Sequence, residues 1–335
     1  TYGKKCGLLV ACIVVLIISP APYLKILSTI IDHIYGIGSV NAIFLAAILS
    51  MFYMIKGGFK PVLNTDKFQF ALMYLGFAAV LFYLYKNYGG YSFLFTNLSP
   101  QKLSIPGDLN WSYIFVWSFI SIVTFIDPNF YHRTFSGVST EAIQRGIYTS
   151  VCLWFLFDFM SISIGLYSAA ILTEVQSSPY LDLALDILPP FLQAIFIISM
   201  FSIVMSTIDS LIFLSGVTIG KDILIQISNI ANKNVYYSRI GIIITAIISV
   251  FLATFFNNAI DMWYISGSFG VSVILVPLLS IFYNQKIKYP MLIIISPLFV
   301  TTIWFYFNPY GLDPMYPGLI CSFICFIIFR ERSSN

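Results

Sequence analysis

The stretch FLQAIFIISMFSIVMSTIDSLIFLSGVTIG, residues 191–220, decides the fold of this chain. It is apolar over a length that crosses a bilayer as one helix, since a span needs roughly 17 to 25 residues. In its middle, residues 206–210 read Ser-Thr-Ile-Asp-Ser, so most of this short segment carries side-chain oxygen. A carboxylate at the centre of a membrane helix costs about 2.5 to 3.5 kcal/mol on insertion scales, and it normally faces a partner or a watery cavity. The stretch therefore predicts a transmembrane helix on the route of an ion or a solute.

The composition of the whole chain agrees with this interpretation. Of its 335 residues, 59% are hydrophobic and only 9% are charged, a balance that a soluble domain does not tolerate on its surface. We therefore predict an all-α polytopic membrane protein with about ten transmembrane helices. The apolar runs that predict these helices are residues 6–33, 39–55, 68–85, 111–127, 147–173, 191–220, 238–256, 259–283, 290–307 and 315–329.

The distribution of basic residues predicts how the chain is oriented, because positive charge is retained on the cytoplasmic side of short loops. Apart from Lys25, which lies within the first span, all Lys and Arg residues except Lys86 and Lys102 fall on one side of the ten-span arrangement. Both ends are therefore predicted to be cytoplasmic, in an integral, multi-pass protein of the cell membrane. The net charge of +3 reflects this loop bias and gives no reason to expect a nucleic-acid partner.

The histidines and cysteines argue against an enzyme. His33 and His132 lie far apart in sequence and on opposite predicted sides of the membrane, so neither a metal cluster nor a nucleophile and base pair is expected. The five cysteines lie within or beside apolar runs and form no C-x-x-C pair, which is typical of small core residues. We expect no catalytic residues and no cofactor.

Three segments resemble motifs of one transporter family. Residues 56–69, KGGFKPVLNTDKFQ, are similar to the G-G-[LF]-x-A-V-x-x-T-D-x-x-Q segment of the sodium/solute symporter family. Residues 205–210, MSTIDS, followed by 220–223, GKDI, resemble that family's S-[ST]-L-x-S helix and the T-x-D-[IL]-Y turn that ends it. The inner loop 127–145 resembles a third family motif, Q-R-x-[LF]-[AS]-x-[KS]-S-x-x-E-A-x-[KR]. The three segments have the family's order and predicted membrane side, and the resemblance that they indicate extends over nearly the whole chain.

The resemblance implies a fold. The family has the leucine-transporter-like fold, in which two inverted five-helix repeats hold solute and sodium near the midplane of the membrane. By this resemblance the chain is a single transmembrane transporter domain, residues 1–335, that lacks the first two core helices. Residues 1–85 then correspond to the last three helices of the first repeat, 111–283 to the second repeat and 290–329 to two additional helices.

A stripe of oxygen atoms on the helix 191–220 is the first candidate site. Ile203, Ser206, Thr207 and Ser210 follow the i, i+3, i+4, i+7 spacing and so share one helix face. Hydroxyls and the spare lone pair of a helix carbonyl can ligate a small hard cation. The resemblance implies that Ser206 and Thr207 give side-chain oxygens, and Ile203 its carbonyl, to a sodium ion. The alternative is that the hydroxyls only bond neighbouring helices, contacts that average about 0.6 kcal/mol.

A second sodium site is implied near Asp66, Asp209 and Ser210. Asp209 is a carboxylate inside a predicted span, so it needs protons, cations or hydrogen-bond donors around it. Asp66 precedes an apolar run, and the Asp66 to Gln69 spacing is also typical of a helix N-cap with a capping box. For Asp66 both interpretations, helix cap and ion ligand, stay open at this stage.

The candidates for solute binding are Asp158, Ser266 and Ser268. Asp158 lies near the centre of the span 147–173, where it can meet an amine, another cationic group or a proton; pairing with the hydroxyl of a neighbouring helix is the alternative. The two serines belong to the run 266–270, SGSFG, whose small residues permit either unwinding of the span or close helix packing.

These observations predict a sodium-coupled secondary active symporter that imports a small polar organic solute by alternating access. Its expected partners are Na⁺ as coupling ion and sole metal, the solute, and the lipid bilayer. One alternative is a proton-coupled carrier in which Asp209 or Asp158 titrates. The other is a membrane sensor or regulatory module derived from a symporter.

Overall fold

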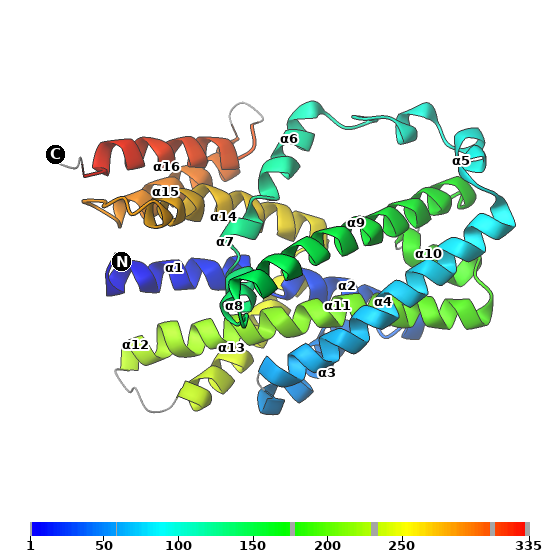
Figure 1. Cartoon of the computed structure of the whole chain (residues 1–335), viewed down its shortest axis with the longest axis horizontal. Coiled ribbons are helices and arrows are strands. Elements are labelled where there is room, and N and C mark those ends of the chain that lie inside the picture. Colours follow the sequence, from blue (N-terminus) through cyan, green and yellow to red (C-terminus); the bar gives the residue numbers. More distant parts are fainter. Residues whose placement is uncertain (1, 58, 175–177, 229–233, 309–311, 332–335) are drawn as a thin grey trace. The chain divides into compact units, whose positions relative to one another are not determined.

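The computed structural model confirms that the chain is helical (Figure 1). It describes residues 2–57, 59–174, 178–228, 234–308 and 312–331, with the side chains of residues 52, 53 and 55–61 excepted. Within these ranges the only β-structure is an isolated bridge between Ile287 and Arg330. Part of the family-like segment 56–69 lies outside the described residues, namely Gly58 and the side chains up to Pro61.

The chain divides into two compact units. Unit 1 comprises Thr1–Pro22, Trp111–Tyr131 and Leu211–Asn335, and unit 2 comprises Tyr23–Asn110 and His132–Ser210. Helices α8 (Pro128–Phe135) and α11 (Pro190–Val217) pass from one unit into the other. The remaining helices of unit 1 are α1 (Lys4–Ile17), α6 (Trp111–Ile120), α7 (Val123–Ile126), the π-helix η2 (Thr218–Leu224), α12 (Ile225–Ser228), α13 (Asn234–Phe255), α14 (Ala259–Phe282), α15 (Leu292–Phe307) and α16 (Met315–Phe329). Those of unit 2 are α2 (Ala21–Tyr35), α3 (Ser39–Gly57), α4 (Phe59–Tyr88), α5 (Tyr91–Asn97), the 3₁₀-helix η1 (Pro100–Leu103), α9 (Thr140–Ile171) and α10 (Pro179–Asp186).

Helices in unit 1 pack closely because small residues face one another. Gly216 and Gly220 are spaced four apart at the end of α11 and in η2, and both lie against α13. A Cβ atom added to Gly220 would lie 2.6 Å from the Cα of Ser238, and one added to Gly241 would lie 2.1 Å from the carbonyl oxygen of Gly216. This is the small-residue spacing that lets membrane helices bring their backbones together. The same principle applies to α14, α15 and α16, which lie side by side in Figure 1.

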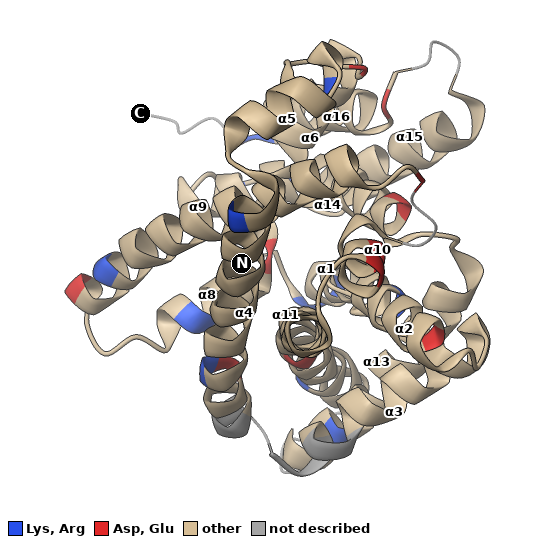
Figure 2. Ribbon diagram, turned by 90° about the vertical axis from the view of Figure 1, so that its right-hand side faces the viewer, with Lys and Arg blue, Asp and Glu red and all other residues tan. Residues whose placement is uncertain are grey.

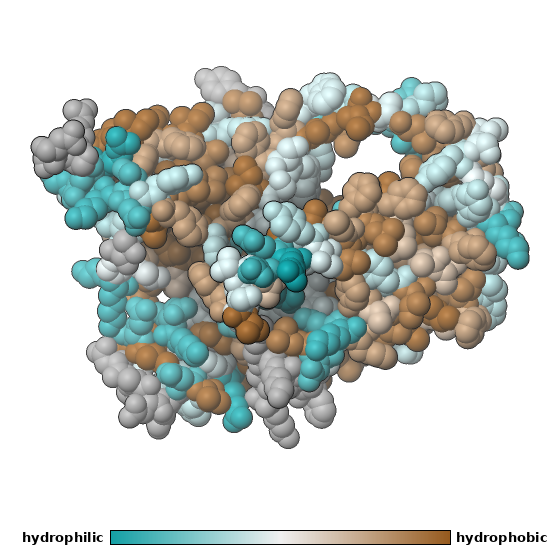
Figure 3. All heavy atoms as spheres, viewed as in Figure 1, coloured by the Kyte–Doolittle hydropathy of each residue, from teal (hydrophilic) through white to brown (hydrophobic). Residues whose placement is uncertain are grey.

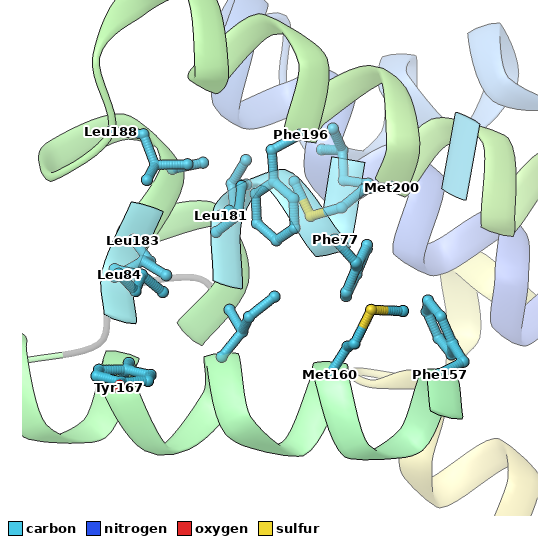
Figure 4. Packing of buried hydrophobic residues seen from close by; sticks show 14 of the residues in the cluster. Phe77, Leu84, Phe157, Met160, Tyr167, Leu181, Leu183, Leu188, Phe196 and Met200 are labelled. Atoms are coloured by element: carbon cyan, nitrogen blue, oxygen red, sulfur yellow. The ribbon is translucent and has the colours of Figure 1, made fainter. Parts of the chain in front are cut away.

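Unit 2 has an aromatic and aliphatic core between α4, α9, α10 and α11 (Figure 4). Phe77 of α4 lies at its centre, with its ring centroid 4.9 Å from those of both Phe157 and Phe196. Tilted rings at this separation gain about 0.5 to 1.5 kcal/mol beyond the burial of their area. The core therefore holds α4, α9 and α11 together on the side of the unit away from residues 206–210.

Helices α4 and α11 run in opposite directions and touch at Gly76. A Cβ atom on Gly76 would lie 1.7 Å from the Oγ of Ser199, and the single proton of that hydroxyl is shared between the carbonyls of Leu72 and Ile195, both at 2.8 Å. Only a glycine leaves room for this contact. The contact brings the preceding turns of α4 alongside the following turns of α11, where Asp66 and Ser206 lie.

The helices are those of an integral, multi-pass membrane protein. Six segments are long and apolar enough to cross a membrane, and the bent pair Trp111–Ile126 and Pro128–Phe135 makes a seventh if it forms one span. The six are Lys4–Tyr35, Val62–Tyr88, Thr140–Ile171, Pro190–Ser228, Asn234–Phe255 and Ala259–Phe282. Figure 2 shows how few charged residues the helices carry, and Figure 3 shows broad hydrophobic surface on the face in view. The predicted count of ten spans stays a prediction, because Ser39–Met51, Leu292–Phe307 and Met315–Phe329 are shorter apolar helices.

Some predicted boundaries were wrong. The first run, 6–33, is confirmed as one segment long enough to cross a membrane, Lys4–Tyr35, but it consists of two helices, since α1 ends at Ile17 and α2 begins at Ala21, with Pro20 between them. Proline has no N–H to continue the helix, and it disfavours helical backbone at the residue before it. The run 68–85 is also longer than predicted, because α4 begins at Phe59 and includes the polar residues before the apolar stretch.

Candidate functional site

The candidate site lies in unit 2, where α4, α8 and α11 each contribute one polar surface. Asp66 comes from α4, Arg133 from α8, and Ser206 and Ser210 from α11. Ser206 and Ser210 are four apart, so both project from one face of α11. Helix α8 begins where Asp127 precedes Pro128, and the Asp127 carboxylate accepts a hydrogen bond from the N–H of Asn129 at 2.8 Å. An acidic cap followed by proline is a standard helix start, and it sets the position of Arg133.

The Asp66 carboxylate is bound through both oxygens. Ser206 Oγ donates to Asp66 Oδ1 at 2.7 Å, and an Arg133 guanidinium nitrogen lies 3.3 Å from Asp66 Oδ2. The same nitrogen donates to Ser210 Oγ at 2.7 Å. The Asp66 side chain is 16% exposed and that of Arg133 is 46% exposed. The structure thus brings the predicted residues Asp66, Ser206 and Ser210 together, with a cationic side chain bonded to two of them.

Asp66 is not a helix cap. Helix α4 begins at Phe59, so Asp66 lies almost two turns inside it and the N-cap interpretation was wrong. A carboxylate inside a helix cannot accept a hydrogen bond from the neighbouring backbone N–H groups, because these already donate to carbonyls of the preceding turn. Its oxygens are therefore available to groups on other helices, which is how Ser206 and Arg133 engage them.

Thr207 and Ile203 lie one turn from Ser206 and bond each other. Thr207 Oγ1 donates to the Ile203 carbonyl at 3.1 Å. The Ile203 carbonyl oxygen, which we predict to ligate sodium, therefore already accepts a hydrogen bond from the threonine hydroxyl. The Thr207 oxygen keeps its own lone pairs, so the pair still offers acceptors on this face of the helix.

Asp209 is completely buried, at 0% exposure, next to Ser210 in α11. Burial of a carboxylate is costly unless charge or hydrogen bonds compensate it. The predicted role of Asp209 as a sodium ligand stays a prediction.

The solute candidates lie elsewhere. Asp158 is exposed on α9 of unit 2. Its side chain interacts electrostatically with that of Tyr74, which lies two turns along α4 from Asp66. Ser266 and Ser268 lie in unit 1, on α14, and Ser268 donates a hydrogen bond to Asp313 Oδ1 at 3.1 Å. Helix α14 is continuous through the run 266–270, so the unwinding alternative was wrong.

Close packing explains the small residues of that run. A Cβ atom on Gly267 would lie 2.7 Å from the Ile120 side chain, and one on Gly270 would lie 3.1 Å from that of Ile126. Glycine at these positions lets α14 approach α6 and α7 within unit 1.

Sequence reasoning missed Arg133 as a member of the site. The sequence places Arg133 in a family-like loop and among the charges predicted to be cytoplasmic. A usable signal was the need of Asp66 for a counter-charge, since carboxylates in apolar helices are usually paired. The partner is 67 residues away in sequence, so no local pattern identifies it.

The arrangement offers cation-binding chemistry. The guanidinium of Arg133 contacts Asp66 Oδ2 and Ser210 Oγ, and Ser206 Oγ bonds the other carboxylate oxygen. All four oxygens are hard donors of the kind that bind alkali and alkaline-earth cations. Among the residues that the structure describes, no three His, Cys, Asp or Glu side chains cluster to hold a metal. A cation at this position would therefore depend on hydroxyls as well as on one carboxylate.

Comparison with known proteins gives consistent matches. A model of the sodium:solute symporter family matches residues 3–289, which include all three family-like segments. The chain is similar to the sodium/pantothenate symporter of Escherichia coli (strain K12), with 24% identity over 311 residues that cover 88% of this chain and 64% of that protein. It is also similar to the sodium/pantothenate symporter of Haemophilus influenzae (strain ATCC 51907 / DSM 11121 / KW20 / Rd), with 25% identity over 256 residues that cover 72% of this chain and 52% of that protein. The chain thus spans less than two thirds of the length of either relative.

Proposed function

Since the chain belongs to the sodium:solute symporter family, a family of transporters, we propose that it works as a sodium-coupled symporter that imports a small organic solute. The observation that carries this proposal is the meeting of the Asp66 carboxylate with the hydroxyl stripe of α11 inside unit 2. A carboxylate held between membrane helices marks an ion or solute route. Its nearest neighbours are oxygen ligands that suit sodium.

Sodium binds at this site in competition with Arg133. The guanidinium supplies the positive charge that Asp66 needs and bonds Ser210 as well, so it mimics a bound cation. When sodium enters, it takes over the Asp66 and serine oxygens, and Thr207 adds a further hydroxyl from the next position of α11. Release of Arg133 then frees α8 from α4 and α11. The ion thereby changes contacts between helices and not only the charge of one residue.

Differential affinity links the ion to transport. A ligand shifts a conformational equilibrium only by the difference of its affinities for the two states. In the proposal, sodium binds tightly to the state in which Arg133 is released and weakly to the state in which Arg133 is bound. A sodium gradient therefore biases the protein toward one state on each side of the membrane, which is the requirement of alternating access.

The relatives suggest which solute to test first. Both are named as sodium/pantothenate symporters, so pantothenate is the first candidate solute for this protein. Asp158 is the proposed solute residue of α9, and Ser266 and Ser268 are those of α14. An ionised Asp158 repels a carboxylate-bearing solute, so a preference for an amine-bearing solute over pantothenate would support a direct contact with Asp158.

The test is uptake by the full-length protein in liposomes, with an inward gradient of sodium, of choline or of protons. We expect pantothenate or another small organic solute to accumulate with sodium only, and the double variant Ser206→Ala, Thr207→Ala to lose both accumulation and sodium-dependent thermal stabilisation while still inserting. Thr302→Ala is the matched control, because Thr302 Oγ1 also bonds its own helix, at 2.7 Å to the Leu298 carbonyl, but in unit 1. Uptake driven by protons alone, or an unchanged sodium response in the double variant, contradicts the proposal.

A further inference from the structure

Unit 1 contains a pocket that is separate from the sodium site proposed in unit 2. Its volume is about 230 Å³, and it lies between α14, the end of α15 and the two residues before α16, Asp313 and Pro314. The residues that define its chemistry are Tyr264, Ser268, Phe269, Phe305, Asn308 and Asp313. The pocket lies beside the C-terminal end of α15 and the N-terminal end of α16, two apolar helices.

The carboxylate of Asp313 is the central polar group of this pocket. Asp313 is 9% exposed. Its Oδ1 accepts hydrogen bonds from the N–H of Met315 at 2.7 Å and from Ser268 Oγ at 3.1 Å, so this oxygen caps α16 and ties it to α14. Its Oδ2 is buried and accepts no hydrogen bond from the described part of the chain, although Tyr264 lies close enough to interact with the carboxylate.

The charge of Asp313 has no cationic counterpart in the pocket wall. No Lys, Arg or His is among the described residues that line it. A buried carboxylate that is left without a counter-charge costs several kcal/mol, so it recruits a cation or a proton. The capping of α16 accounts for the position of Oδ1, but it does not account for the burial of Oδ2 beside the pocket.

The remaining walls select among cations. Tyr264, Phe269 and Phe305 line the same pocket, and the rings of Phe269 and Phe305 form an edge-to-face pair with centroids 6.0 Å apart. Aromatic walls with one carboxylate are the features by which proteins recognise organic ammonium groups. The volume is also far larger than a bare metal ion fills, since a water molecule occupies only about 30 Å³ in the liquid.

We propose that this pocket binds a small organic ammonium group, with Asp313 as its counter-charge and the aromatic rings of α14 and α15 as its walls. The group comes either from a free amine in solution or from the headgroup of a phospholipid, because both present the same chemistry at the membrane interface. The proposal does not depend on sodium coupling, since none of its residues belongs to the site in unit 2, and it shares only Ser268 with the proposed solute residues.

Asp313→Asn is a well-matched test variant. Asparagine is as good an N-cap as aspartate, and its amide oxygen can still accept from Met315 and Ser268, so the variant removes the charge and keeps the cap. Asp186→Asn is the control, because it makes the same chemical change at an exposed position of unit 2.

The measurement is the Tm of the full-length protein in detergent at constant sodium, with added ethanolamine or choline chloride compared with equal potassium chloride. We expect the amine to raise the Tm of the wild type by roughly 2 to 5 °C at about tenfold excess over its Kd. In Asp313→Asn the affinity falls by about tenfold or more, whereas Asp186→Asn behaves as the wild type. Native mass spectrometry after reconstitution with phosphatidylethanolamine or phosphatidylglycerol identifies the source: retention of one more phosphatidylethanolamine by the wild type than by Asp313→Asn indicates the lipid headgroup.

Two outcomes overturn the proposal. One is an equal response of the wild type and Asp313→Asn to the amines, together with equal lipid retention. The other is a Tm that depends on pH in the wild type but not in Asp313→Asn, with no response to amines, because a proton then occupies the carboxylate. Failure of sodium-driven uptake leaves these measurements unaffected, so the two proposals fail separately.

Discussion

Replacing Arg133 by glutamine tests whether the guanidinium competes with a cation for Asp66. The pair of Arg133 and Asp66 is separated by 3.3 Å, but the arginine side chain is 46% exposed, so solvent screening limits its contribution to about 1 kcal/mol or less. The bond from Arg133 to Ser210 is shorter, at 2.7 Å, and a charge-assisted bond of this kind adds roughly 1 kcal/mol. Together the two contacts favour the arginine-bound state by about 1 to 2 kcal/mol.

This free energy sets the size of the expected effect. If sodium must displace the guanidinium, removal of both contacts raises the apparent sodium affinity by roughly 5- to 30-fold, the factor that 1 to 2 kcal/mol represents. Thermal stability in the absence of sodium falls slightly, because Asp66 loses its counter-charge. The two changes have opposite signs, so they are distinguishable in one titration.

The assay is a sodium titration of thermal stability, with potassium chloride holding the ionic strength constant, followed by the sodium midpoint of uptake in liposomes. Arg145→Gln is the control, because Arg145 lies 3.9 Å from Glu141 with both side chains 84% exposed, and loss of that pair leaves both midpoints unchanged. A sodium midpoint for Arg133→Gln that stays at the wild-type value, or moves to higher concentration, refutes competition between the arginine and the ion.

Two further predictions concern the packing of the helices. Gly220→Ala places a Cβ atom 2.6 Å from the backbone of Ser238 and is expected to destabilise unit 1 by about 1 to 3 kcal/mol in thermal unfolding. The control is Gly146→Ala, which has no atom within 4 Å of the new Cβ and is expected to be neutral or stabilising by up to about 1 kcal/mol. Equal Tm values for the two variants contradict this account. Gly76→Ala overlaps the Ser199 hydroxyl and is expected to lower both the Tm and the sodium response. Adding Ser199→Gly to the same chain is expected to restore both in part, with a coupling free energy between the two substitutions of about 0.5 to 3 kcal/mol. Strictly additive effects show that the two residues do not define the contact.

Sequence patterns predicted those parts of the molecule that depend on local spacing. The apolar runs located the helices, and the i, i+3, i+4, i+7 pattern identified the face of α11 that carries Ser206 and Ser210. The role of Asp66 came from the family resemblance and not from its neighbours, which favoured a helix cap equally well. The start of α4 was missed because Asn64, Asp66 and Lys67 are polar, and hydropathy does not separate a polar helical turn from a loop.

Contacts between distant segments were beyond the reach of local patterns. Arg133 meets Asp66 and Ser210 across 67 and 77 residues of sequence, and Ser268 meets Asp313 across 45. Periodicity states which face of a helix is polar, but it does not state which helix that face meets. The run 266–270 illustrates the same limit, because Gly267 and Gly270 are equally compatible with unwinding and with packing until Ile120 and Ile126 are seen beside them.

The candidate site depends on packing as much as on its polar residues. Aspartate and serine are short, so Ser206 reaches Asp66 at 2.7 Å only where the backbones of α4 and α11 are close. The contact between Gly76 and Ser199 provides that approach, and the bond from Ser199 to the Leu72 carbonyl fixes it. Any larger residue at position 76 separates the helices, and the change reaches Asp66 because α4 is continuous between the two positions. Gly76 therefore sets the distance between the Asp66 carboxylate and the hydroxyls of α11, which are the proposed ligands of the ion.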